Sequence, residues 1–220
     1  MEILLENKPT GWYIKSMARP KKDALQQSSK DKLLEAATVL IRTNGYSSTT
    51  VDDLCLKAGV SKGTFFHNFK SKEELAVAAA QNWSLKTGEF FKAASYNKKK
   101  DPLDRFLGYI RFRKEILQGD LPEFTCLVGT MVQETYDSHP EIKVACYESI
   151  FDHAESLKSD IHLARELYAK RSKWSSESLA LHTQAVIQGA FILAKASGDV
   201  KIASQSIDHL ENYIRLLFNK

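Results

Sequence analysis

The sequence has little of what marks a secreted, membrane-spanning or disulfide-stabilised protein. Its 220 residues include only three cysteines, an odd number without a CxxC pair. This argues against a disulfide framework and against a cysteine-rich zinc site. No apolar run approaches the roughly 18 residues that a membrane span needs, and the first residues lack the basic and apolar regions of a secretory signal. We therefore expect a protein of the reducing cytoplasm.

Signatures of catalysis are also missing. The sequence contains no H-E-x-x-H, G-x-S-x-G, G-x-x-x-x-G-K-[ST] or G-x-G-x-x-G motif. Residues 29–32 fit S-x-x-K, but the companion motifs of that catalytic set do not occur. The six histidines are scattered without the spacing of metal ligands. We expect no enzyme, no catalytic residue, no metal site and no cofactor.

Few residues interrupt helices, and the basic charge is uneven. Only 5 prolines and 10 glycines occur, so long helices are favoured. The net charge is +4, but residues 1–72 carry 12 Lys and Arg against 7 Asp and Glu, whereas residues 73–220 carry 19 against 20. Such a distribution indicates either an anionic partner for the N-terminal part or a solvated basic tail.

Residues 1–28 are polar and show no apolar period, and we expect a flexible arm. Met17 offers an alternative start, so residues 1–16 need not belong to the native protein. The basic stretch at residues 19–22 has two interpretations. It either reaches phosphates or the minor groove or is a solubilising tail.

Four capped helices are predicted from residue 29 onward. Apolar residues at spacings of three and four predict a first helix that begins at Ser29 or Lys30 and ends at residues 44–45. Thr50, Ser61 and Ser71 are the expected N-caps of the next three helices.

The second and third of these helices are joined by a short turn, Ala58-Gly59-Val60-Ser61. Gly59 permits the positive φ that such a turn needs. Phe65 and Phe69 of the third helix are expected to face the core. This is the layout of a helix-turn-helix.

The rest of the chain is also predicted to be helical. The expected helices span residues 71–94, 102–118, 123–137, 139–159, 177–196 and 200–218, and residues 161–171 either extend the helix before them or form a separate piece. The predicted fold is all-α, with a three-helix helix-turn-helix domain at residues 29–75. A larger helical effector-binding and dimerisation domain is expected at residues 76–220.

The N-terminal motifs occur in a fixed order over some 40 residues. They are Asn44-Gly45-Tyr46, Thr49-Thr50-Val51-Asp52-Asp53-Leu54, Ala58-Gly59-Val60-Ser61-Lys62-Gly63-Thr64-Phe65-Phe66-His67-Asn68-Phe69 and Ser71-Lys72-Glu73-Glu74-Leu75. This string resembles the DNA-binding domain of the TetR family, the tetracycline-repressor-like regulators. Further along, residues 124–129, Glu134 and residues 139–141 resemble a "GCL…E…HPE" stretch of some family members.

The resemblance implies that the third helix reads the major groove of DNA. The residues that it places at the DNA are Thr49, Thr50, Ser61, Lys62, Gly63, Thr64, Phe66, His67 and Lys72. The family usually has tyrosine where this chain has Phe66, and often an aromatic residue where it has Asn68. Phe66 lacks the hydroxyl that bonds phosphate, so the pattern of phosphate contacts differs.

The resemblance also implies a homodimer that pairs through the last two helices and reads a palindromic operator. The expected function is a repressor that a small-molecule effector releases from that operator, with an activator as the alternative. The apolar residues expected on these helices are Leu179, Leu181, Val186, Ile187, Ala190, Phe191, Leu193, Ile207, Leu210, Ile214, Leu216, Leu217 and Phe218. A helix-turn-helix that binds protein instead of DNA is a further alternative.

The effector is expected in a cavity between the middle helices, with walls rich in aromatic residues and methionine. The candidate lining residues are Phe106, Tyr109, Ile110, Arg113, Phe124, Cys126, Met131, Tyr136, Tyr147 and Phe151. The alternative is that they form an ordinary core. Cys126 also carries the hypothesis of a reactive sensor thiol, provided that nearby arginines favour its thiolate.

Overall fold

The structure, a computed structural model, describes residues 27–220, and this part of the chain is helical without a strand. The elements are α1 (Ser29–Asn44), α2 (Val51–Ala58), α3 (Lys62–Asn68), α4 (Lys72–Ala93), the 3-10 turn η1 (Ser95–Lys98), α5 (Pro102–Glu115), α6 (Leu121–Phe124), α7 (Leu127–Thr135), α8 (Pro140–Tyr168), α9 (Ser176–Ser197) and α10 (Val200–Leu217). The all-α prediction is confirmed. The predictions for residues 1–26 lie outside the described residues.

Side-chain caps define the N-terminal helices, as the sequence indicated. Thr50 accepts a hydrogen bond from the backbone N–H of Asp53, whose carboxylate accepts one from Thr50 in return. The side chains of Ser61 and Ser71 cap α3 and α4 by accepting hydrogen bonds from the backbone N–H groups of Thr64 and Glu74. The cap of α1 is Ser28, one residue before the expected start. Because these caps satisfy the free N–H groups at the helix ends, they fix where each helix begins.

The turn between α2 and α3 depends on a glycine. Gly59 has φ 64° and ψ 40°, in the left-handed region, and ends α2. Because a side chain is disfavoured in this conformation, glycine is the residue that allows α3 to leave at its angle to α2.

One helix predicted from the sequence is divided into two helices in the structure. Residues 123–137 were predicted as a single helix, but α6 ends at Phe124 and α7 begins at Leu127. Cys126 is the N-cap of α7, where its Sγ accepts a hydrogen bond from the N–H of Gly129 at 3.4 Å. Of the two alternatives for residues 161–171, the extension is correct, because α8 continues to Tyr168.

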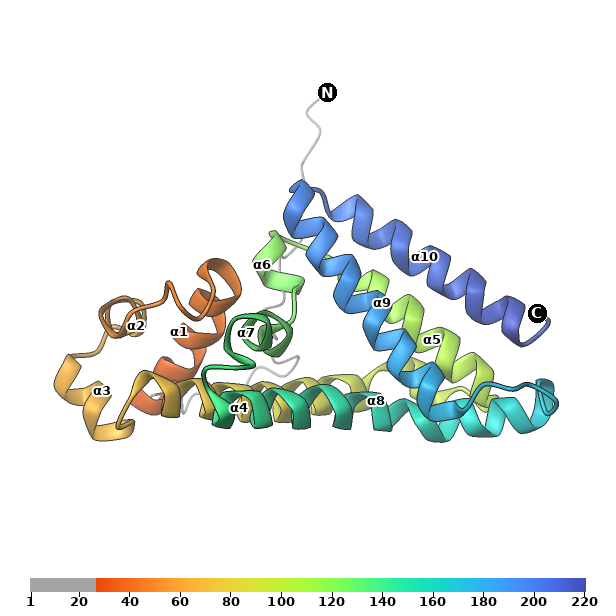
Figure 1. The fold of residues 1–220 in the computed structure, drawn as a ribbon, viewed down its shortest axis with the longest axis horizontal. Helices are drawn as coiled ribbons and strands as arrows, with labels where there is room; N and C mark the ends of the chain where they lie inside the picture. Colours follow the sequence, from red (N-terminus) through yellow and green to blue (C-terminus); the bar gives the residue numbers. More distant parts are fainter. Residues whose placement is uncertain (1–26) are drawn as a thin grey trace, which may run out of the picture.

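The helices form an elongated arrangement (Figure 1). Helices α1 to α3 lie at one end and α5, α9 and α10 at the other, while α4 and α8 pack side by side along the length. The short helices α6 and α7 lie between the two ends.

Two clusters of buried side chains hold this arrangement together. One includes the inner faces of α1 to α3 and the first half of α4, and it continues into α7 and α8 through Leu127, Met131, Ile142 and Cys146. The other joins the end of α4 with α5, the rest of α8, α9 and α10. The helix-turn-helix is therefore packed on the body through a shared core, and the expected boundary near residue 75 falls inside α4.

None of the helices between residues 27 and 220 is long and apolar enough to cross a membrane. Within the same range, no group of three His, Cys, Asp or Glu side chains is placed to hold a metal ion.

Candidate DNA-binding surface and effector cavity

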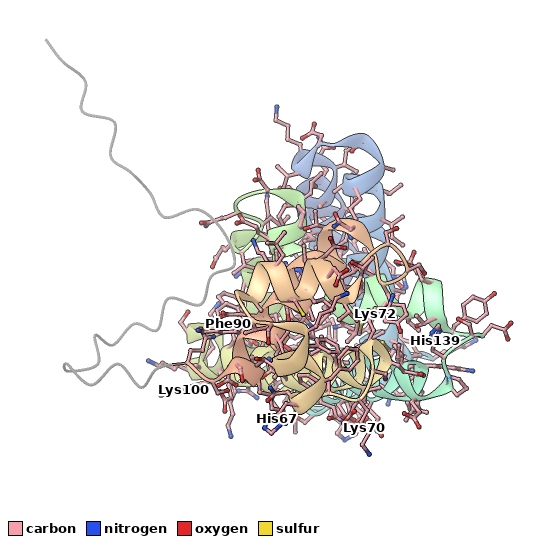
Figure 2. All side chains as sticks on the ribbon, turned by 90° about the vertical axis from the view of Figure 1, so that its left-hand side faces the viewer. His67, Lys70, Lys72, Phe90, Lys100 and His139 are labelled. Carbon is pink, nitrogen blue, oxygen red and sulfur yellow. The ribbon has the colours of Figure 1, made fainter. Side chains whose placement is uncertain are left out.

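Helix α3 has one buried side and one exposed side. Phe65 is fully buried and Phe69 is nearly so, and both belong to the N-terminal core. The opposite side presents Lys62, Gly63 and His67 to solvent. Figure 2 looks onto this end of the molecule, with His67 at its outer edge. The two phenylalanines thus anchor the helix and aim its polar side outward.

Phe66 stands out on this surface because its side chain is 56% exposed. Its ring meets the edge of the Phe65 ring, with 5.1 Å between the centroids. An apolar ring exposed in the middle of a polar helix face gains little from water. It is suited to contact with a sugar or a thymine methyl group.

Two of the expected DNA contacts are held by neighbours within the domain. Lys62 Nζ lies 2.7 Å from Asp52 Oδ1, and both side chains are about two-thirds exposed. Thr50 Oγ1 donates to Asp53 Oδ2 at 2.6 Å. An exposed ion pair of this kind is weak, so Lys62 can exchange Asp52 for a phosphate at small cost.

Thr64 and Ser61 form a pair at the start of α3. Ser61 Oγ accepts a hydrogen bond from the N–H of Thr64 and lies 3.0 Å from Thr64 Oγ1. Gly63 leaves the backbone uncovered beside them, with only Ser61 Oγ near the position where a Cβ would be. This part of α3 permits the closest backbone approach to a ligand.

Two of the residues expected at the DNA, Thr49 and Lys72, use their side chains for contacts within the domain. Thr49 is fully buried, and its hydroxyl donates to the carbonyl of Gly45 at 2.7 Å. Lys72 Nζ donates to the carbonyls of Tyr46 and Thr49, both at 3.0 Å, and lies over the Tyr46 ring at 4.2 Å from its centroid. Burial lowers the pKa of Lys72. Both side chains shape the loop before α2, and the expected contact of phosphate with the helix N-termini at these positions stays a prediction.

The same loop is also held from the body of the molecule. The carboxylate of Glu134, on α7, accepts hydrogen bonds from the backbone N–H groups of Tyr46 (3.0 Å) and Ser47 (2.8 Å). Gly45 precedes them with φ 88°, and a Cβ there would clash with Glu134 Oε1. In the sequence, Glu134 is marked only by the resemblance, because a contact over 88 positions leaves no local pattern.

Arg42 on α1 makes a second connection between the DNA-binding helices and the body, and the sequence did not predict it. Arg42 is 6% exposed, its Nε donates to the carbonyl of Thr125 at 2.8 Å, and its guanidinium lies 5.0 Å from the centroid of the Trp83 ring. Burial lowers the pKa of Arg42 to about 10, so it stays protonated at neutral pH. Lys195, on α9, donates to the Arg42 carbonyl at 3.2 Å. The end of α1 is thereby tied to the turn between α6 and α7.

A cavity of about 40 Å³ lies directly behind these connections. It is lined by Trp83, Thr87, Phe91, Arg113, Phe124, Cys126, Val128, Ser149, Ile150, His153, Gln184, Gln188 and Phe191. The residues come from α4 to α9, and the volume is enough for about three water molecules.

Three of the ten expected lining residues, Arg113, Phe124 and Cys126, are at this cavity. Four others lie in the buried core and not on the cavity wall: Phe106, Tyr109, Ile110 and Met131. The expectation is corrected for Tyr136, Tyr147 and Phe151, which lie on the surface with 63%, 56% and 42% exposure. Helix periodicity does not say which face of a long helix such as α8 meets the core when both faces carry aromatic residues.

Buried polar groups surround the cavity. The hydroxyl of Tyr109 accepts a hydrogen bond from Gln184 Nε2 and lies 2.9 Å from His153 Nε2. Burial, with the nearby charge of Arg113, lowers the pKa of His153 to about 3. His153 is therefore neutral at physiological pH, and its ring serves as a hydrogen-bonding group and not as a charge.

The last two helices divide their apolar residues between two directions. Leu179, Ile187 and Phe191 are buried in the core. Ile192 and Leu193 of α9 are 48% and 54% exposed, and Tyr213 and Leu216 of α10 are 43% and 75% exposed. These four residues, which we call the α9–α10 apolar surface, have no covering element among residues 27–220.

The sequence of this chain is similar to those of known bacterial regulators. Residues 33–79 match the family model described as bacterial regulatory proteins, tetR family. The HTH-type transcriptional regulator of the lacX 3′ region of Lactococcus lactis subsp. lactis is 22% identical over 84% of this chain and 92% of its own length. The HTH-type transcriptional regulator YvdT of Bacillus subtilis (strain 168) is 28% identical over 71% of each chain.

The fold has counterparts among solved structures. The crystal structure of a TetR-family transcriptional regulator from Agrobacterium tumefaciens superposes with a TM-score of 0.74 at 19% identity. The match covers 85% of this chain and 97% of that one. The relatives named here are transcriptional regulators.

The contact of Glu134 with the loop is testable by substitution. We expect Glu134→Ala to lower the free energy of urea unfolding by about 1 kcal/mol, because two backbone N–H groups exchange a carboxylate for water. The amides of Tyr46 and Ser47 should exchange hydrogen faster. The exposed Glu89→Ala on α4 is the matched control and should change neither quantity. Unchanged exchange at the loop in Glu134→Ala would contradict the contact.

The neutral state of His153 predicts a pH dependence of stability. An unfolded histidine has a pKa near 6.5, whereas that of His153 in the fold is about 3. Below pH 6.5 the unfolded chain binds the extra proton, so stability falls as the pH drops. Between pH 7.5 and pH 5 we expect His153 to account for about 2 kcal/mol of the loss in unfolding free energy. His153→Gln should remove that part, whereas the exposed His162→Gln should retain it.

The three thiols should differ in their rates of alkylation. Cys55 and Cys146 are buried, and burial raises the pKa of both, that of Cys146 to about 12. Cys126 is partly exposed at the cavity. Under native conditions iodoacetamide should therefore modify Cys126 first, as mass spectrometry of the digested protein can show. The sensor hypothesis for Cys126 requires more. Iodoacetamide must alkylate Cys126 faster in the native protein than in the protein unfolded in urea.

Proposed function

Because residues 33–79 match the family model of bacterial regulatory proteins, tetR family, and the chain is similar to HTH-type transcriptional regulators over most of its length, we propose that it is a homodimeric repressor that a small-molecule effector releases from a palindromic operator. It is a helix-turn-helix transcriptional regulator. The observation that carries the proposal is the exposed face of α3, where Lys62, Phe66 and His67 project while Phe65 anchors the helix from behind.

We assign direct DNA contacts to seven residues on and beside α3. They are Thr50, Ser61, Lys62, Gly63, Thr64, Phe66 and His67. Lys62, His67 and the hydroxyl groups contact phosphates, while Phe66 packs on sugar or on a thymine methyl group. Phosphate contacts position the helix, and the base contacts select the sequence.

The dimer forms through the α9–α10 apolar surface. Ile192 and Leu193 of α9 and Tyr213 and Leu216 of α10 are large apolar side chains exposed on two adjacent helices, and exposed apolar surface of this kind favours contact with another protein. A second copy would cover them by packing its own α9 and α10 against these helices, as in a four-helix bundle. Two recognition helices about 34–36 Å apart then match successive major grooves of a palindrome.

The effector acts by shifting the balance between two conformations of the body. The cavity meets the DNA-binding domain at two places. Trp83 of α4 lines the cavity and contacts Arg42, and Thr125, which binds Arg42, lies between the lining residues Phe124 and Cys126. A ligand that moves these cavity-lining residues changes the packing of α1 on the body as well as the direction of α4. The separation of the two α3 helices then no longer fits both half-sites.

Fluorescence anisotropy tests the DNA-binding part of this proposal. The purified protein is titrated onto a duplex from the region upstream of its own gene and onto a scrambled duplex, at two salt concentrations. We expect selective binding that weakens with salt, because phosphate contacts release counterions. Lys62→Ala should weaken binding and reduce the slope of log affinity against log salt by about 1.8, because a dimer loses one phosphate contact in each half-site and each contact contributes about 0.9.

The control is Lys170→Ala, an exposed lysine after α8 at the far end of the molecule, which should leave the affinity and the slope unchanged. Absence of binding to both duplexes at low salt would contradict the proposal and favour a helix-turn-helix that binds protein. A duplex-dependent gain of transcription in a reconstituted assay would identify an activator instead of a repressor.

A further inference from the structure

Arg113 is a buried cation without a buried anion. Its side chain projects from α5 to the cavity wall and is only 6% exposed. Its Nε is buried without a hydrogen-bond partner, and no ion pair joins it to another described residue. The other cations of α5 that face neighbouring helices are all paired: Arg105 with Asp160, Arg111 with Glu211 and Lys114 with Asp208.

The residues around Arg113 offer no compensating charge. None of the thirteen residues that line the cavity is an aspartate or a glutamate. His153 is neutral, and the other polar lining groups are the side chains of Thr87, Ser149, Gln184 and Gln188. The cavity therefore has a net positive charge and several groups that can donate hydrogen bonds.

Two aromatic rings partly stabilise this charge. The Arg113 guanidinium lies 5.2 Å from the centroid of the Phe91 ring and 5.4 Å from that of Phe191. Such contacts attract a cation electrostatically, but they leave N–H groups without acceptors. A buried arginine usually pairs with an anion, and its planar fork matches the two oxygens of a carboxylate.

The rest of the cavity wall indicates the body of the ligand. Trp83, Phe124, Val128 and Ile150 line it together with Phe91 and Phe191, and the Phe124 and Phe191 rings lie 6.1 Å apart. These side chains favour an apolar group. A single guanidinium balances one negative charge, whereas a phosphate dianion would leave one in excess. The small volume of about 40 Å³ favours a ligand of few atoms.

We propose that the cavity binds a small organic monocarboxylate, with its carboxylate on Arg113 and its apolar body among the aromatic side chains. This inference rests on the proposed function in taking the cavity as the effector site. The ligand brings the missing acceptor to Nε of Arg113, so its negative charge is required for binding.

The test compares acids with their amides. Calorimetric titration of the full-length protein uses acetate, propionate and butyrate, each beside its primary amide and beside inorganic phosphate. Each amide keeps the shape of its acid but lacks the charge. We expect at least one carboxylate to bind tenfold or more tightly than its amide and than phosphate.

Two variants test whether the carboxylate binds to the positive charge of Arg113. Arg113→Met replaces the aliphatic stem of the side chain but removes the guanidinium, and should weaken binding of that carboxylate by about 30-fold or more, the usual loss when one partner of a buried charge pair is removed. Arg111→Met removes a cation of the same helix that already has Glu211 as its partner, and should leave binding unchanged. The melting temperature of ligand-free Arg113→Met should equal or exceed that of the unchanged protein, because a buried unpaired charge is lost; this shows that the variant is folded.

The outcomes separate this inference from the proposed function. If no carboxylate binds better than its amide, if phosphate binds more tightly, or if Arg113→Met binds the carboxylate as well as the unchanged protein, the inference is wrong. If a carboxylate binds through Arg113 but leaves the affinity for operator DNA unaltered, the inference stands and the proposed effector role of the cavity fails.

Discussion

The buried guanidinium of Arg42 connects the DNA-binding helices to the rest of the molecule. It extends from the last turn of α1, donates to the carbonyl of Thr125 and lies over the ring of Trp83. Because the charge is almost completely enclosed, its contacts constrain both sides of the junction at once. Glu134 adds a second connection by accepting two backbone N–H groups of the loop before α2. The orientation of α3 depends on these contacts, since the same loop and α1 support it.

The position of the cavity follows from this junction. Trp83, Phe124 and Cys126 line the cavity and are the neighbours of Arg42 or of the carbonyl that it binds. A core that joins α1 to α4 with α7 and α8 transmits small displacements, because close-packed side chains cannot absorb them individually. Helix α4 passes through residue 75 without interruption, so the helix-turn-helix and the body share this helix. An effector would therefore change how the helix-turn-helix packs on the body, and would not act only by moving α4.

Local chemistry made the helix-turn-helix predictable, whereas long-range packing limited the prediction of the sites. The side chains of Thr50, Ser61 and Ser71 cap the helices that the sequence assigned to them, because a cap depends on residues three positions apart. The break at Cys126 was missed, since a cysteine is an unusual cap and the apolar period continues across it. Thr49 and Lys72 resemble surface residues by type, yet the carbonyls of a neighbouring loop bind their side chains. Arg113 was predicted at the cavity. Its lack of a hydrogen-bond partner at Nε could not be predicted, because it depends on the side chains that five other helices place around it.

We propose that two copies of this chain read DNA as a symmetric pair. Selection of duplexes from a random library by the purified protein, followed by sequencing, tests this arrangement without knowledge of the operator sequence. We expect enrichment of a two-fold symmetric sequence whose half-site centres lie about 10–10.5 base pairs apart, or a multiple of that spacing. Enrichment of no sequence, or of a single asymmetric site bound by one copy, would contradict it.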